Sequence, residues 1–161
     1  MRKVFFTVSI LMFFLFFAGA QEIPELNQKI TEYVKAQLGK KVDRGECWDL
    51  AYEALTLNNC EWDGKFYFGN KLNPSVDSIY PGDIIQLYNV VLKHRIGNQI
   101  IKETYGQHTA VVYNKSGKGI FEIAHQNNGY SGRKVGISEL NLRDKVSGTI
   151  IFFRPVAKTN R

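Results

Sequence analysis

The chain has 161 residues, which is enough for one domain with a hydrophobic core but not for two comfortable ones. Hydrophobic residues make up 44% of it and aromatic residues 13%, a composition that excludes an intrinsically disordered protein. The formal net charge of +6 is dispersed, with no run of five basic residues and no nucleic-acid-binding motif, so nucleic acid is not an expected partner.

The N-terminal segment has the pattern of a secretory signal. Arg2 and Lys3 precede an apolar run from Val4 to about Ala18, which is shorter than the ~20 residues of a spanning helix. The run ends in an A-x-A cleavage pattern at 18–20. Residues 1–20 are therefore predicted to be a signal peptide and 21–161 a single secreted or periplasmic domain without stable membrane insertion. An uncleaved anchor is the alternative. Cleavage lowers the net charge to +4, which suits work near an anionic surface such as a bacterial wall.

The first half of the mature chain is predicted to be mostly helical. Apolar residues recur at intervals of three and four over 23–38, and Gly39 follows as a candidate C-cap. A second helix is predicted over 47–57, where Leu50, Ala51, Ala54 and Leu55 form its apolar stripe. Residues 61–79 are expected to form an irregular or partly extended loop.

The second half is predicted to be mostly extended. A turn feeds a strand over 80–92, and a loop or ragged strand follows over 93–106. Strands are predicted at 108–114 and 119–127, a connector with one helical turn at 138–144, and a last strand at 147–156. This order predicts an α+β fold in which N-terminal helices pack on an antiparallel sheet of about four to six strands.

The hairpin around KSGKG carries polar residues at one end. A two-residue turn at Ser116-Gly117 would place His108 directly opposite His125, with Cβ atoms about 5 Å apart. Asn127 lies two residues beyond His125 and so faces the same way. The same face is predicted to carry an apolar floor, made of Ala110, Val112, Phe121 and Ile123.

Cys47 lies in the first turn of the second predicted helix. The helix dipole there can lower a thiol pKa from ~8.5 to between roughly 3.5 and 7.5. If this helix end packs against His108, the parts of a cysteine hydrolase are present. Cys47 would attack, its amide would help to hold the oxyanion, His108 would accept the thiol proton, and His125 or Asn127 would orient the His108 ring.

Four motifs in this order resemble the CHAP family, the cysteine, histidine-dependent amidohydrolases/peptidases. They are GECW at 45–48, YPGDII at 80–85, QHTAVV at 107–112 and HQN at 125–127. Family members usually show G-x-C, then P-G-D, then H-x-A-x-V, then E-Q-N. The resemblance covers about residues 43–128 and implies a papain-like fold, with the nucleophile at a helix N-terminus and the base on a central strand.

One position departs from the family pattern, because His125 stands where a glutamate is usual. The related NlpC-type cell-wall peptidases use a histidine as third member, so the role stays open between His125 and Asn127. The resemblance implies an amidase or peptidase that acts on peptidoglycan, at the muramoyl–alanine amide or at a stem or cross-bridge peptide bond. The protein is expected to be a monomer and to need no cofactor. The same chemistry could instead act on a host or competitor protein.

Other interpretations assign the same residues no hydrolytic role. Singly, Cys47 suits a buried spacer, His108 and His125 suit structural partners, and Asn127 suits a turn. A Cys47–Cys60 disulfide would need Cα atoms within about 7 Å, whereas a helix over 47–57 separates them by about 15 Å, so Cys60 is expected to be a free buried thiol. The domain could be a weak or inactive module that binds wall fragments or a protein. Cys47, His108 and His125 could also bind zinc, although no usual ligand spacing is present.

Overall fold

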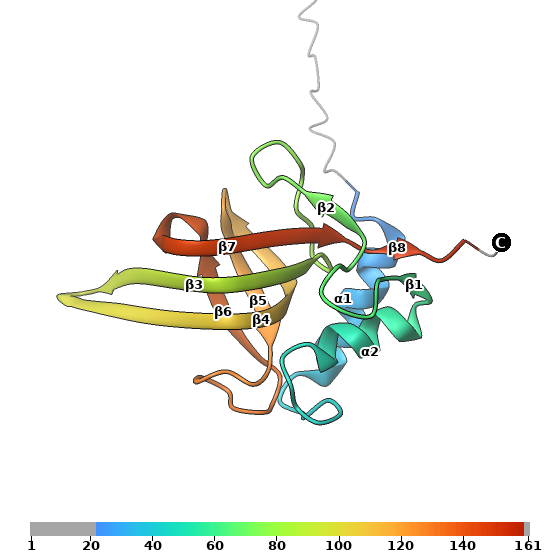
Figure 1. Cartoon of the computed structure of the whole chain (residues 1–161), viewed down its shortest axis with the longest axis horizontal. Coiled ribbons are helices and arrows are strands. Elements are labelled where there is room, and N and C mark those ends of the chain that lie inside the picture. The colour runs from blue at the N-terminus through green and yellow to red at the C-terminus, as the bar shows by residue number, and fades with distance from the viewer. Residues whose placement is uncertain (1–21, 160–161) are drawn as a thin grey trace, which may run out of the picture.

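Two helices pack against a curved antiparallel sheet in the computed structural model, which describes residues 22–159 (Figure 1). The predicted signal peptide, residues 1–20, lies outside the described residues. Helix α1 spans Glu25–Gln37 and helix α2 spans Asp49–Leu57, close to the predicted ranges. Neither is long and apolar enough to cross a membrane, and no other helix of the described part is either. The expected stripe of α2 is buried, since Leu50, Ala51, Ala54 and Leu55 are each at most 1% exposed.

Six strands form the main sheet, in the order β2-β7-β3-β4-β5-β6, and all neighbours in it are antiparallel. The strands are β2 (Asn70–Leu72), β3 (Ile84–Ile96), β4 (Gln99–Gly117), β5 (Ile120–His125), β6 (Gly136–Asn141) and β7 (Lys145–Arg154). A separate two-stranded sheet pairs β1 (Cys60–Glu61) with β8 (Val156–Ala157). The predicted α+β fold is confirmed.

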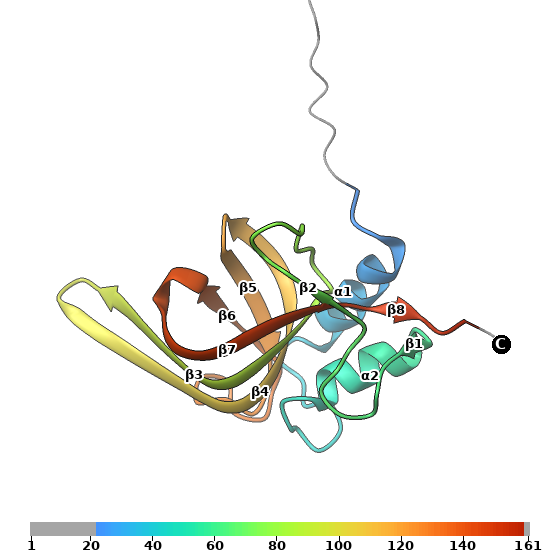
Figure 2. The ribbon, with the colours of Figure 1, turned by 45° about the horizontal axis from the view of Figure 1, so that its top comes forward.

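The sheet curls so that its two ends face each other across a concave side (Figure 2). One hydrophobic core, which includes Val34, Leu55 and Phe153, lies between the helices and the convex side. A second core fills the concave side and includes Leu87, Phe121 and Phe152. The predicted floor of Ala110, Val112, Phe121 and Ile123 belongs to this second core.

The prediction of a loop or ragged strand over 93–106 is wrong, because these residues continue β3 and β4 as one long hairpin. Ile96 pairs with Gln99 across a two-residue turn at Gly97-Asn98, where Gly97 has φ +58°. Such turns favour glycine and asparagine and match the twist of paired strands. Because the hairpin tip is exposed on both faces, its sequence lacks the alternation of apolar and polar residues on which the prediction relied.

Two further predictions about the second half are corrected. The β4–β5 turn lies at Lys118-Gly119, not at Ser116-Gly117, and the ladder contains two register shifts. Next to the site, Val111 pairs with Ala124, so His108 and His125 are diagonal neighbours and not direct partners. Residues 136–141, partly predicted as a connector, form strand β6, and only 142–144 make a helical turn.

The P-G-D motif at 81–83 ties the two layers together. The buried Asp83 carboxylate accepts hydrogen bonds from the Asn27 amide of α1 at 2.8 Å and from the Tyr80 backbone N–H at 2.9 Å. The Arg154 guanidinium at the end of β7 binds both carboxylate oxygens, at 3.0 and 2.8 Å. Such two-pronged contacts are strong and directional, so this carboxylate fixes α1 relative to β3 and β7.

Gly82 permits the close approach of this turn to α1, and its replacement tests the arrangement. Its φ is +86°, and an added Cβ would lie 2.3 Å from the Asn27 carbonyl oxygen. We expect Gly82→Ala to lower the free energy of unfolding by about 2–4 kcal/mol in urea titrations. Gly97→Ala is the control, because Gly97 also has positive φ but an added Cβ there meets nothing within 4 Å. Equal losses in both variants would contradict the proposed clash.

Candidate active site

The buried side chain of Gln126 anchors the loop that precedes α2. Its carbonyl oxygen accepts from the Val42 backbone N–H at 3.1 Å. Its amide nitrogen donates to the backbone oxygens of Val42, at 3.0 Å, and of Glu46, at 2.9 Å. Because Gln126 directly follows β5, these bonds hold the residue before Cys47 at the end of that strand.

Asp49 shapes the same loop from the other side. Its buried carboxylate accepts from the Glu46 backbone N–H at 2.9 Å and pairs with the Arg44 guanidinium at 2.7 Å. Helix α2 therefore begins at Asp49, and Cys47 lies in the turn just before it, not in the first helical turn as predicted. The helix start is still close enough for the Cys47 thiol to contact the N–H groups of Cys47 and Trp48.

This loop brings Cys47 to the free edge of β4. Its Sγ lies 4.0 Å from the Gln107 carbonyl oxygen and contacts the backbone N–H of Thr109. These two residues flank His108 in the chain. The ladder between β4 and β5 ends at Val111 and Ala124, which leaves this edge open to the cysteine. The half-buried thiol is not part of a disulfide, and neither is the buried Cys60, as expected.

His108 and His125 are joined by a short hydrogen bond on the concave side of the sheet. His108 Nε2 lies 2.8 Å from His125 Nδ1, and the two rings are nearly perpendicular. His125 Nε2 in turn lies 2.9 Å from the Ser138 hydroxyl on β6. One nitrogen of His108, Nδ1, has no hydrogen bond among the described residues.

Burial controls the protonation of these groups. It lowers the pKa of His108 to about 4, and burial together with the charge of His108 lowers the pKa of His125 to about 3. Burial also raises the pKa of the Cys47 thiol, although the nearby N–H groups of Thr109, Cys47 and Trp48 oppose this. The sequence led us to expect a lowered thiol pKa, but loss of solvent outweighs the helix end. At neutral pH the site therefore holds a neutral thiol beside two neutral imidazoles.

Asn127 lies in the same segment but points to a different partner. Its amide donates to the Glu46 carboxylate at 2.7 Å, and the Arg133 guanidinium binds the other oxygen of that carboxylate at 3.2 Å. Asn127 adopts φ +57°, the left-handed conformation that asparagine tolerates in turns. The structure thus places Cys47 against the backbone beside His108 and joins His108 to His125, whereas Asn127 supports the loop next to Cys47.

The two imidazoles face each other with the spacing of a hydrogen bond. No group of three or more His, Cys, Asp or Glu side chains within 22–159 is arranged to hold an ion. An ion bound tetrahedrally at ~2.0 Å by both imidazoles would hold the two nitrogens about 3.3 Å apart. The observed 2.8 Å between His108 and His125 is instead a hydrogen-bond distance.

Two residues of the site, Gln126 and Ser138, were not predicted from the sequence. Gln126 belongs to the HQN motif, but only the fold shows that it binds a loop more than 80 positions away. Ser138 was predicted to lie in a connector, so its approach to His125 was hidden by the missed strand β6. The one available signal for Gln126 was that the HQN motif shares its glutamine with the E-Q-N motif of the CHAP family.

A cysteine just before a helix, at the edge of an antiparallel sheet that supplies the histidine, defines a papain-like cysteine proteinase fold. The chain belongs to the AIM3/BBC1 cysteine proteinase-fold domain family, whose model matches residues 24–160. The papain-like fold expected from the sequence is thereby confirmed.

The chain is also similar to a curated protein and to two solved structures. "Altered inheritance of mitochondria protein 3" of Debaryomyces hansenii is 28% identical over 84% of this chain. The chain spans only 17% of the length of that relative. The solved structure of Ly7917 matches with a TM-score of 0.49 and 15% identity, over 79% of this chain and 62% of the other. Ly7917 with the hydrolyzing product of MDP matches with a TM-score of 0.47 and 19% identity, over 80% and 63%.

Gln126→Ala tests whether the loop depends on this one side chain. The change leaves the backbone groups of Val42 and Glu46 unpaired, so we expect the free energy of unfolding to fall by about 2–4 kcal/mol in urea. Asn127→Ala is the control, since it removes one exposed hydrogen bond and should cost less than about 1 kcal/mol. A loss at Gln126 no larger than the loss at Asn127 would show that the loop is held by other contacts.

The buried histidines also predict how stability depends on pH. Both folded-state pKa values, about 4 and about 3, lie below the ordinary 6.5, so the unfolded chain binds more protons as the pH falls. Their contribution is complete above pH 6.5 and is lost on acidification, by about 2 kcal/mol per histidine at about pH 5. Urea unfolding at about pH 7 and about pH 5 measures it. The double variant His108→Gln/His125→Gln should lose less stability over this interval, and an identical loss would refute the assignment.

Proposed function

We propose that this domain is a thiol-dependent hydrolase of amide bonds, in which Cys47 is the nucleophile, His108 the general base and His125 the residue that orients the base. The contact of the Cys47 sulfur with the backbone on both sides of His108 is the observation that carries this proposal. The 2.8 Å contact between the two imidazoles supports the third role.

The neutral resting site implies general-base catalysis instead of a preformed ion pair. As Cys47 Sγ bonds to the substrate carbonyl carbon, its proton moves to His108 Nδ1, and the carbonyl π electrons move to the oxygen. The backbone N–H of Cys47 stabilises that oxyanion. When the intermediate collapses, the C–N bond breaks and the leaving nitrogen takes the proton from His108, which leaves a thioester.

Water completes the cycle. His108 Nδ1 accepts a proton from a water molecule as its oxygen attacks the thioester carbon. The C–S bond then breaks, the acid product departs, and the cysteine sulfur recovers a proton from His108. Through both steps His125 accepts a hydrogen bond from His108 Nε2–H, which keeps Nδ1 directed at the reacting atoms.

The CHAP resemblance supports peptidoglycan as the substrate, at the muramoyl–alanine amide or at a peptide bond. Membership in the AIM3/BBC1 family does not favour one amide substrate over another. An unfolded protein is therefore tested as a substrate alongside peptidoglycan. The signal-like segment at 1–20 supports action outside the cytoplasm. N-terminal sequencing of protein recovered from the culture medium tests that placement, since an N-terminus at Gln21 is expected.

A binding module is the second candidate. The raised pKa of the Cys47 thiol and the histidine in place of the usual glutamate both favour it, because each weakens the nucleophile or its base. Cys60 provides an internal reference, since burial raises its thiol pKa to about 11. An enzyme should show faster alkylation of Cys47 than of Cys60 at neutral pH, and His108→Ala should slow it. Equal reactivity of the two thiols would support the module.

Activity assays test the hydrolase directly. Purified sacculi and an unfolded protein are digested separately, and the released fragments are identified by mass. We expect Cys47→Ser to abolish release, His108→Ala to reduce it by at least about 10²-fold, and His125→Ala to reduce it less. Cys60→Ala is the matched cysteine control and should retain activity. Release that persists in Cys47→Ser, or equal losses at both histidines, would overturn the assigned roles.

A further inference from the structure

The hydrogen bonds of the histidine pair continue across the concave side of the sheet. His125 Nε2 lies 2.9 Å from Ser138 Oγ, and both residues line one cavity together with Tyr105. The Tyr105 hydroxyl donates to the Glu103 carboxylate at 2.8 Å. The Tyr105 ring lies against both imidazoles, with ring centres 5.1 Å from His108 and 6.3 Å from His125. These groups lead from His108 on β4, through His125 on β5 and Ser138 on β6, back to Tyr105 and Glu103 on β4.

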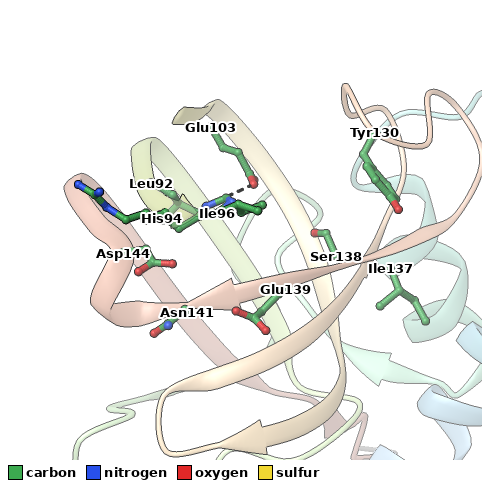
Figure 3. Close-up of a pocket in the computed structure, with 11 residues that line it drawn as sticks. Leu92, His94, Ile96, Glu103, Tyr130, Ile137, Ser138, Glu139, Asn141 and Asp144 are labelled. Carbon is green, nitrogen blue, oxygen red and sulfur yellow. Dashed lines mark ion pairs between the residues drawn. The ribbon is translucent and has the colours of Figure 1, made fainter. Parts of the chain in front are cut away.

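The far end of this network is a carboxylate held in place. Glu103 uses one oxygen for Tyr105 and faces His94 Nδ1 with the other, at 3.9 Å. Figure 3 shows Glu103 and Ser138 projecting from facing strands into a shared cavity of about 630 Å³. A second cavity, of about 380 Å³, is lined by all four of Glu103, Tyr105, His125 and Ser138.

The donors in these contacts give the network a direction. The Tyr105 hydroxyl donates to Glu103, so its oxygen is left as an acceptor, and Ser138 acts on Tyr105 as a donor. Ser138 has one proton, so once it donates to Tyr105 it must accept from His125 Nε2–H. His125 Nδ1 is then unprotonated and accepts from His108 Nε2–H. The proton of each neutral ring thus lies on Nε2.

We propose that Glu103, Tyr105 and Ser138 are positioning residues that fix the tautomers of His108 and His125, so that His108 Nδ1 carries the free lone pair. In the reverse direction Ser138 would donate to His125, both rings would carry the proton on Nδ1, and His108 could not accept the thiol proton. Glu103 thereby supplies from a distance the carboxylate that is absent at position 125. The acceptance of the thiol proton by His108 Nδ1 rests on the proposed function, whereas the assignment of the tautomers does not.

The tautomers can be measured without a substrate. Long-range ¹H–¹⁵N correlation spectra of the uniformly ¹⁵N-labelled protein at neutral pH distinguish a proton on Nε2 from one on Nδ1. We expect the Nε2–H form for both His108 and His125. A proton on Nδ1 of His108 in the unmodified protein would overturn the proposal, whatever the activity.

Tyr105→Phe tests the direction of the network. The change removes one oxygen and frees the Ser138 proton for His125, so the Nδ1–H form should become populated in both rings. If one tenth of the molecules keep the Nε2–H form, kcat should fall about tenfold with KM unchanged. Tyr113→Phe is the control, because Tyr113 packs against the other core. Unchanged tautomers in Tyr105→Phe would refute the proposal.

Ser138 variants provide an independent check should Tyr105→Phe fold poorly. Ser138→Ala removes the link between His125 and Tyr105, whereas Ser138→Thr keeps the hydroxyl. Only the alanine variant should shift the tautomers and reduce kcat, and equal behaviour of both would contradict the proposal. If both rings show the Nε2–H form but the protein hydrolyses no amide, the proposed function is wrong and the proposed tautomers still hold.

Discussion

Three hydrogen bonds from the buried Gln126 side chain hold the loop before α2 against the end of β5. Everything in the site depends on this attachment. Helix α2 packs on the convex side of the sheet, whereas the histidines project from the concave side, so the two can meet only at an open edge. The ladder stops at Ala124, and the loop that Gln126 anchors occupies the edge of β4 that β5 leaves free.

Burial then sets the chemistry of that edge. A helix N-terminus favours a thiolate, and the sequence alone suggested that this effect would dominate. Removal of water acts in the opposite direction on the Cys47 thiol and on both imidazoles, and here it is the larger influence. In a site of neutral groups, reactivity depends on which atoms carry the protons more than on charge. The contacts of Ser138, Tyr105 and Glu103 matter because they determine which nitrogen of each imidazole is protonated.

Much of the fold followed from local patterns. The helical periodicity of α1 and α2 and the alternation around Ala110 and Ile123 reflect burial of one face, and that signal survives without any structure. The long hairpin and strand β6 were missed because their exposed residues lack alternation. The diagonal placement of His108 and His125 was missed because bulges, which leave no clear trace in the sequence, shift the register. Long-range partners such as Gln126 and Val42 cannot be read from local pattern at all.

The Asp83 carboxylate joins parts of the chain that are synthesised far apart in time. Its partners are Asn27 near the beginning of the domain and Arg154 near the end of the last long strand. Until that strand arrives, a nascent chain would have to bury this anion without its guanidinium partner, which is strongly unfavourable. The helical layer is thus expected to dock in its final place only after Arg154 has left the ribosome.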